Sequence, residues 1–189
     1  MSIINQNLLA YWPLNDDSTT AVTNYTSGSS LAGTLTGSPT IVTDTRFGRV
    51  LQLDGTNDYV SIASTTLDLS SDNLTISFWA QGDSSLTTMS NLTVLHAQNT
   101  AGTKTIEVKY PSTGMVSFEA GDASSTDSAS STVNLADYNT TIWVHWAFTK
   151  DSTSDEMKIY RNGVLVATTT SKSQTLGTFN EIYLGASKT

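Results

Sequence analysis

The residues best suited to chemistry lie in one short run, Ile142–Thr149, with the sequence IWVHWAFT. It holds two tryptophans, a phenylalanine and His145, one of only two histidines in the chain. A histidine can act as a base or a metal ligand, and indole rings can stack on sugars. The run is therefore either a binding or catalytic strip or the core strand of a β-sandwich.

The alternation along this run favours a structural role for the histidine. In a strand, Trp143 and His145 point to one face, whereas Val144 and Trp146 point to the other. A strand that is apolar on both faces belongs in the middle of a covered sheet. We therefore expect His145 to be a hydrogen-bonded core residue rather than a base or a ligand. Trp146 is the candidate ligand-binding residue, on an exposed concave face where sugar rings could stack on it.

Catalysis is not expected. A glycosidase needs two carboxyl groups flanking the scissile bond. The four glutamates form no cluster at alternating positions of one strand: Glu107, Glu119, Glu156 and Glu181. His96 and His145 lie on separate predicted strands, without the spacing of a Ser-His-Asp triad. The chain has no cysteine, which excludes thiol catalysis, disulfides and thiolate metal sites.

The overall composition limits the classes of partner that the chain is expected to bind. The net charge is −8 and the nine Lys and Arg residues are scattered, so neither nucleic acid nor an anionic membrane surface is an expected partner. No run of 18 apolar residues predicts membrane insertion. The N-terminal residues MSIINQNLLAYWPL lack the basic and apolar regions of a secretory signal peptide.

The hydrophobic pattern predicts an all-β chain. Apolar and polar residues alternate over many short segments, and roughly three residues in ten are Ser or Thr. The predicted strands cover residues 74–80, 91–97, 104–110, 114–120, 156–160 and 164–168. Asn162-Gly163 predicts a two-residue hairpin turn, and Asp54–Asp58 predicts a longer hairpin loop. The only candidate helical turn is residues 135–138, and polar segments 19–38 and 122–131 are expected to be solvated loops or strand edges.

Several segments in order resemble the laminin-G-like, concanavalin A-like jelly rolls. The matching segments are LLAYWPLNDDSTT from Leu8, FGRVLQLDGTNDYVSI from Phe47, LDLSSDNLTISFWA from Leu67, IWVHWAFTKD with MKIYRNGVLVATT, and NEIYLGAS. In the family, the first and last of these form the opening and the penultimate strand. The resemblance implies a single domain over residues 1–189, a two-sheet antiparallel β-sandwich of the laminin-G-like type.

Two departures from the family pattern bear on a metal and on assembly. Where the family carries an Asp in a calcium-binding turn, this chain has Asn24-Tyr25-Thr26-Ser27-Gly28. A structural calcium, if bound, is expected at Asp16, Asp17 and Asn24. The family also continues past LGA with a closing strand, whereas this sequence stops at Thr189. Either it is a piece of a longer chain, or the strand is missing or supplied by a neighbouring subunit, which would suit a homo-oligomer.

These observations together predict a non-catalytic display or adhesion module. Its partners would be a glycan or another surface ligand and neighbouring structural subunits. The expected setting is a virion surface, as in a phage head-decoration or fibre protein, because the chain lacks cysteine and an export signal and is rich in Ser, Thr and Asn. The alternative is a secreted bacterial lectin-like module of an adhesin or of a polysaccharide-degrading enzyme.

Asp54, Asn57 and Asp58 resemble part of a calcium loop, but a turn explains them better.

Overall fold

The computed structural model describes residues 7–26, 31–82, 92–112, 114–134 and 142–187. All its regular structure is β, and no helix that could span a membrane occurs within these ranges. The strands are β1 (Ala21–Val22), β2 (Gly33–Thr36), β3 (Thr40–Asp44), β4 (Gly48–Gln52), β5 (Tyr59–Leu69), β6 (Leu74–Ala80), β7 (Thr93–Gln98), β8 (Lys104–Ser112), β9 (Met115–Asp122), β10 (Ser125–Thr132), β11 (Val144–Asp151), β12 (Glu156–Arg161), β13 (Val164–Thr169) and β14 (Gly177–Leu184).

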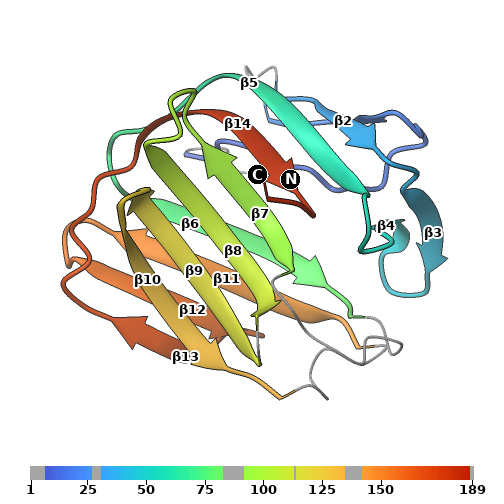
Figure 1. Ribbon diagram of the computed structural model, residues 1–189. Helices are drawn as coiled ribbons and strands as arrows, with labels where there is room; N and C mark the ends of the chain where they lie inside the picture. Colours follow the sequence, from blue (N-terminus) through green and yellow to red (C-terminus); the bar gives the residue numbers. More distant parts are fainter. Residues whose placement is uncertain (1–6, 27–30, 83–91, 113, 135–141, 188–189) are drawn as a thin grey trace.

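Two antiparallel sheets pack face to face, as the sequence predicted (Figure 1). The large sheet has the order β1-β2-β5-β14-β7-β8-β9-β10, and the small sheet has the order β13-β12-β11-β6. The separate ribbon β3-β4 lies beside the sandwich and pairs with neither sheet. This arrangement confirms the two-sheet antiparallel sandwich.

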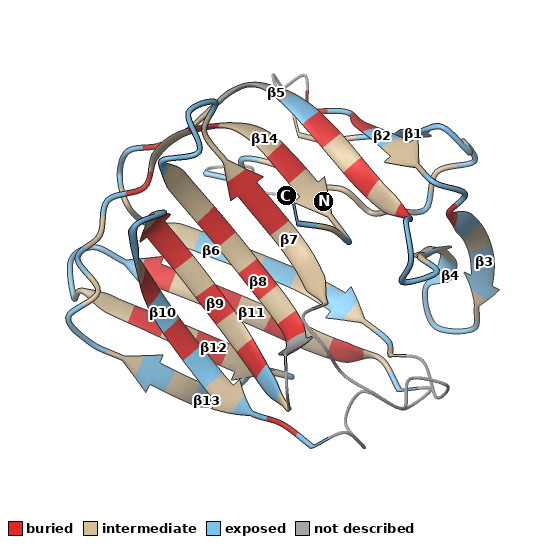
Figure 2. Cartoon of the chain, viewed as in Figure 1, coloured by how far each residue is buried: buried red, intermediate tan, exposed pale blue. Residues whose placement is uncertain are grey.

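The core lies between the sheets and follows the period of two in each strand (Figure 2). On β11, Trp146 and Phe148 are fully buried and point inward. Phe148 contacts Phe78 of the small sheet and Phe118 of the large sheet, with ring centroids 5.7 and 5.8 Å apart. Tyr110 of the large sheet meets the Trp146 ring edge-on at 5.6 Å. These aromatic contacts join the two layers across their centre.

The Asn162-Gly163 turn is confirmed. Both residues have positive φ, 48° and 81°, and Arg161 pairs directly with Val164 across the turn. A two-residue turn with two left-handed residues matches the twist of the strands it joins. The turn brings the Asn162 side chain back over the neighbouring strand β11, which matters for the site below.

The polar segments predicted as loops or strand edges do lie at the edges of the large sheet. The described part of segment 19–38 contains β1, the first strand of that sheet, and its neighbour β2, and segment 122–131 lies largely in β10, the last strand. On β10 the buried side chains are Asp127 and Ala129. An edge strand needs few apolar side chains, so its sequence resembles a loop.

Two predictions about loops and strands are wrong. Residues 54–58 do not close a hairpin, because β4 pairs with β3 whereas β5 pairs with β2 and β14. The N-terminal segment around Trp12 packs on the core without forming a strand, and the Trp12 indole donates to the Leu31 carbonyl at 2.7 Å. The predicted helical turn at 135–138 lies outside the described residues.

Candidate functional site

A cluster of aromatic side chains lies on the outer face of the small sheet. Trp79 of β6 and His145 of β11 are opposite one another in the strand register, and their rings lie 5.1 Å apart. Trp79 is 41% exposed, unlike its inward-facing neighbour Phe78. A tryptophan that keeps this much ring surface in water beside other aromatic rings is a candidate for ligand contact.

The tip of the β3-β4 ribbon completes this cluster. Asp44 ends β3, and its Oδ1 accepts the backbone N–H groups of Arg46 at 2.8 Å and Phe47 at 3.0 Å. Such an Asx turn fixes the reversal locally, and Gly48 supplies a φ of 74° at its end. The turn directs Phe47 onto the rings of Trp79 and Trp143, with centroid distances of 5.2 and 4.9 Å.

A hydrogen bond fastens the ribbon to the sheet. The Trp143 indole N–H donates to Asp44 Oδ2 at 2.9 Å. This bond, together with the backbone N–H of Phe47, holds the pKa of Asp44 below its usual value of 3.8. Both carboxylate oxygens of Asp44 are therefore engaged in holding the wall of the site.

The other wall comes from the β12-β13 turn. The backbone N–H of His145 donates to Asn162 Oδ1 at 2.9 Å, and the Asn162 N–H donates to the His145 carbonyl at 2.8 Å. This reciprocal pair fixes the Asn162 side chain with its carbonyl oxygen used. Its NH₂ group is the part that remains to act as a donor.

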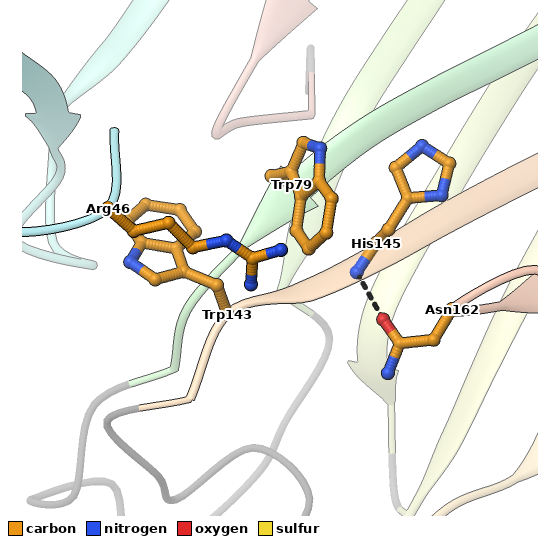
Figure 3. Close-up of a pocket in the computed structure, with 5 residues that line it drawn as sticks. All are labelled: Arg46, Trp79, Trp143, His145 and Asn162. Carbon is orange, nitrogen blue, oxygen red and sulfur yellow. Dashed lines mark hydrogen bonds between the residues drawn. The ribbon is translucent and has the colours of Figure 1, made fainter. Parts of the chain in front are cut away.

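These elements enclose an open pocket of about 400 Å³. Its lining residues are Arg46, Trp79, Trp143, His145 and Asn162, and we call it the tryptophan pocket. Figure 3 shows the Arg46 guanidinium extending beneath Trp79 toward the Asn162 side of the pocket. It lies 4.2 Å from the centre of the Trp79 ring, a cation–π contact. Aromatic walls with a few polar donors are typical of sites that bind small ligands.

Comparison with known proteins identifies the superfamily to which the fold belongs. A family model described as the concanavalin A-like lectin/glucanases superfamily, of laminin G type, matches residues 54–189. The chain belongs to this superfamily. No curated protein matches it.

Solved structures share the lectin-like fold at low sequence identity. The binding domain of botulinum neurotoxin DC in complex with rat synaptotagmin II has a TM-score of 0.70 and 16% identity, covering 96% of this chain and 44% of that chain. The binding domain of Paraclostridial mosquitocidal protein 1 has a TM-score of 0.66 and 12% identity, covering 90% and 44%. Domains LG4-5 of the mouse laminin alpha1 chain have a TM-score of 0.55 and 17% identity, covering 69% and 32%. This lectin-like chain thus spans less than half of each of these structures.

The structure corrects the two assignments made for the IWVHWAFT run. Trp146 is 0% exposed and lies in the core, so its ring is not available for stacking on a sugar. His145 is only partly buried, on the outer face, and lines the tryptophan pocket. The predicted alternation of side chains along the strand is correct, but the prediction that the His145 face is the buried one is wrong. Both faces of β11 are apolar, and the sequence alone does not say which face a second sheet covers.

The glutamates are less scattered than the sequence suggested. Glu107 of β8 and Glu119 of β9 are direct cross-strand partners and so share one face of the large sheet. Lys109 lies between them, with its Nζ 2.9 Å from Glu107 Oε2 and 3.7 Å from Glu119 Oε1. The two carboxylates lie on neighbouring strands and not at alternating positions of one strand, and the lysine offsets the repulsion between them. His96 and His145 do lie on separate strands, as expected, and these strands belong to different sheets.

The residues predicted for calcium are engaged with other groups. Asp17 forms an ion pair with Arg49, and Asp16 Oδ2 accepts the Thr23 N–H at 3.0 Å. Asn24 Oδ1 accepts the N–H groups of Tyr11 at 2.9 Å and of Thr26 at 3.2 Å. Oxygen donors suit calcium in kind, but one side-chain oxygen of each of these residues is engaged within the protein. Calcium binding here stays a prediction.

The second acidic segment has a structural role in the described fold. Asp58 is 6% exposed, and its two oxygens accept the backbone N–H groups of Ser38 at 2.6 Å and Asp54 at 3.1 Å. Asp54 Oδ1 accepts the N–H groups of Thr56 and Asn57. These are turn-stabilising bonds, as expected for Asp54, Asn57 and Asp58, although the turn joins different sheets.

Sequence reasoning missed Arg46, Trp79 and Asn162 as site residues. Trp79 falls on a predicted strand, and Asn162 has the ordinary features of a turn residue. Arg46 directly precedes the segment from Phe47 that resembles the family, and it carries no motif of its own. Trp79 and His145 point to the same outer face, and this could have indicated the site. It can be recognised only once the pairing register of β6 and β11 is known.

Proposed function

We propose that the chain is a non-catalytic binding module that takes a glycan into the tryptophan pocket. The observation that carries the proposal is the exposed Trp79 ring, which lies beside Trp143 in a pocket supplied with hydrogen-bond donors. Sugar rings present C–H groups on one face and hydroxyls around the edge. An indole face and a few fixed polar groups complement both.

The positions of the pocket residues support a prebuilt site. Asp44 anchors the ribbon, and the Asn162 turn is bonded to β11 at two points, so both walls are fixed before a ligand arrives. Preorganisation of this kind lowers the entropic cost of binding. One similar structure is a botulinum neurotoxin binding domain in complex with SialylT, which is consistent with a ligand-binding role for the fold.

The test is glycan-array screening followed by calorimetry on the Trp79→Ala variant. Because Trp79 is 41% exposed, its truncation should leave the fold intact. Loss of one stacking face should weaken the best array ligand by about 10-fold, the equivalent of roughly 1.4 kcal/mol. The matched control is Tyr25→Ala, which removes a 60% exposed ring outside the pocket and should change nothing. Unchanged glycan affinity in Trp79→Ala would contradict the proposal.

The biological setting is a further part of the proposal. We propose a virion surface component, with a secreted lectin-like module of an adhesin or polysaccharide-degrading enzyme as the alternative. Light scattering with and without chelator separates them. A stable homo-oligomer unaffected by chelator supports a structural subunit. A monomer whose melting temperature falls on calcium removal supports the secreted module, with calcium at Asp16, Asp17 and Asn24.

A further inference from the structure

The polar groups that face the tryptophan pocket are donors. Arg46 stacks on Trp79 at 4.2 Å and lies 5.1 Å from the Phe47 ring centre. No described residue gives its guanidinium an ion pair or a hydrogen bond. Stacking leaves the edge of a guanidinium plane free, where its N–H groups can meet a planar anion in pairs.

The opposite side of the pocket also offers donors. Asn162 Oδ1 is used by the His145 N–H, which leaves the amide NH₂ for a ligand. The His145 ring lines the pocket and can donate from a ring nitrogen. Arg46, His145 and Asn162 thus present donors from two walls of one pocket.

The acceptors and negative charge must then come from the ligand. None of the five lining residues is acidic. The nearby acid, Asp44, has one oxygen bonded to the Arg46 and Phe47 N–H groups and the other to Trp143, and the charge of Arg46 is the smallest of the causes that lower the pKa of Asp44. A pocket with a cation and without an acidic lining residue stands out on a chain of net charge −8.

We propose that the tryptophan pocket selects sugars that carry a carboxylate. This inference rests on the proposed glycan-binding function. A carboxylate on a pyranose ring places a planar anion beside an apolar ring face, and in this pocket the Arg46 guanidinium lies over the Trp79 ring, 4.2 Å from its centre. The guanidinium would pair with the two carboxylate oxygens, and the indoles would contact the ring.

The experiment compares matched ligands by calorimetry. The probes are a galacturonate trisaccharide and its methyl ester, with sialyllactose and its methyl ester as a second carboxylate and neutral pair. The wild-type chain should bind each acid at least about 10-fold more tightly than its neutral counterpart, because hydrogen bonds to charged groups are the stronger ones. The preference should shrink as salt is raised.

Two arginine variants locate the effect. Arg46→Gln should weaken the acidic ligands by about 10- to 100-fold and the neutral ones little, which removes the preference. Arg49→Gln removes an exposed arginine of the same ribbon that pairs with Asp17 outside the pocket, so it should keep the preference. Circular dichroism and the melting temperature verify that both variants fold.

The remaining outcomes separate the two proposals. Equal affinity of the wild-type chain for acids and neutral partners would overturn the carboxylate inference and leave glycan binding standing. The carboxylate inference is likewise overturned if Arg46→Gln keeps the preference, or if a sulfated sugar is bound more tightly than the carboxylated one. Absence of binding to every glycan, neutral or acidic, would overturn both.

Discussion

At the scale of single residues, Asp44 links the two parts of the site. One oxygen closes the ribbon turn and the other accepts the Trp143 indole, so a single ionised side chain positions Phe47 and Trp143 together. The same bonds lower its pKa below 3.8, which means that the folded state favours the carboxylate. The contribution is therefore fully present above about pH 4 and is lost as the pH falls through the lowered pKa.

This pH dependence can be read from the indole N–H signal of Trp143. We expect its chemical shift to titrate with a midpoint below 3.8, the ordinary value for aspartate. Asp44→Asn should abolish the titration. The indole of Trp12, which donates to the uncharged Leu31 carbonyl, is the internal control and should not titrate with it. A midpoint at or above 3.8 would contradict the assigned role.

Lys150 is a second residue whose substitution should have a measurable effect, in this case on the free energy of unfolding. It is 2% exposed on β11, and its Nζ lies 2.8 Å from Asp127 Oδ2 of β10 and 2.6 Å from the Lys172 carbonyl. The pair joins the two sheets inside the sandwich. Removing one partner of a buried pair leaves the other charge without compensation.

We expect Lys150→Met to lower the free energy of unfolding by about 3–5 kcal/mol, measured by urea denaturation. Lys158→Met is the matched control, because Lys158 pairs with Glu156 on the solvent side of the next strand, and it should change stability little. Equal effects of the two variants would show that the Lys150–Asp127 pair stabilises the fold no more than an exposed ion pair does.

At the scale of elements, the β3-β4 ribbon joins the site through side chains and not through a strand ladder. It pairs with neither main sheet, and its tip is held by Phe47 and Asp44 against Trp79 and Trp143. An element held by a few side-chain contacts opens at lower free energy than a strand in a ladder. The ribbon can therefore be loosened without unfolding the sandwich.

Hydrogen exchange tests this independence. Phe47→Ala should speed the exchange of the β3 and β4 amides severalfold and leave the amides of β11 protected, because only the ribbon contact is lost. Thr45→Ala, in the same turn and likewise exposed but without an aromatic ring, serves as the control and should have little effect. Uniformly faster exchange across β11 would instead mean that the ribbon is part of the cooperative core.

The sequence predicted most strands, and it failed where long-range pairing decides the outcome. Alternation placed β6 at residues 74–80, and Asn162-Gly163 indicated the β12-β13 turn, because both signals are local. The assumed hairpin at 54–58 failed because the partner of β4 precedes it in the chain. The sequence also pointed to Trp146 and not to Trp79 as the ligand-binding residue, because it does not show which face of a strand is covered. Burial of one face depends on which sheet packs there, and that is a property of the whole chain.

At the scale of the whole molecule, the four tryptophans sample distinct regions. Trp146 lies in the core and Trp12 in the N-terminal segment, whereas Trp79 and Trp143 line the pocket. Each indole N–H gives one nuclear magnetic resonance signal, so one signal reports on the core, one on the N-terminal segment and two on the tryptophan pocket. A glycan that binds anywhere on the protein can thus be assigned to a region.

The most direct test of the central claim is a titration of these four indole signals with the best ligand from the glycan array. We predict that the Trp79 and Trp143 signals shift together and saturate at the affinity found by calorimetry, while the Trp12 and Trp146 signals stay in place. Saturable binding that leaves the Trp79 and Trp143 signals unmoved would place the ligand elsewhere and contradict the tryptophan pocket as the binding site.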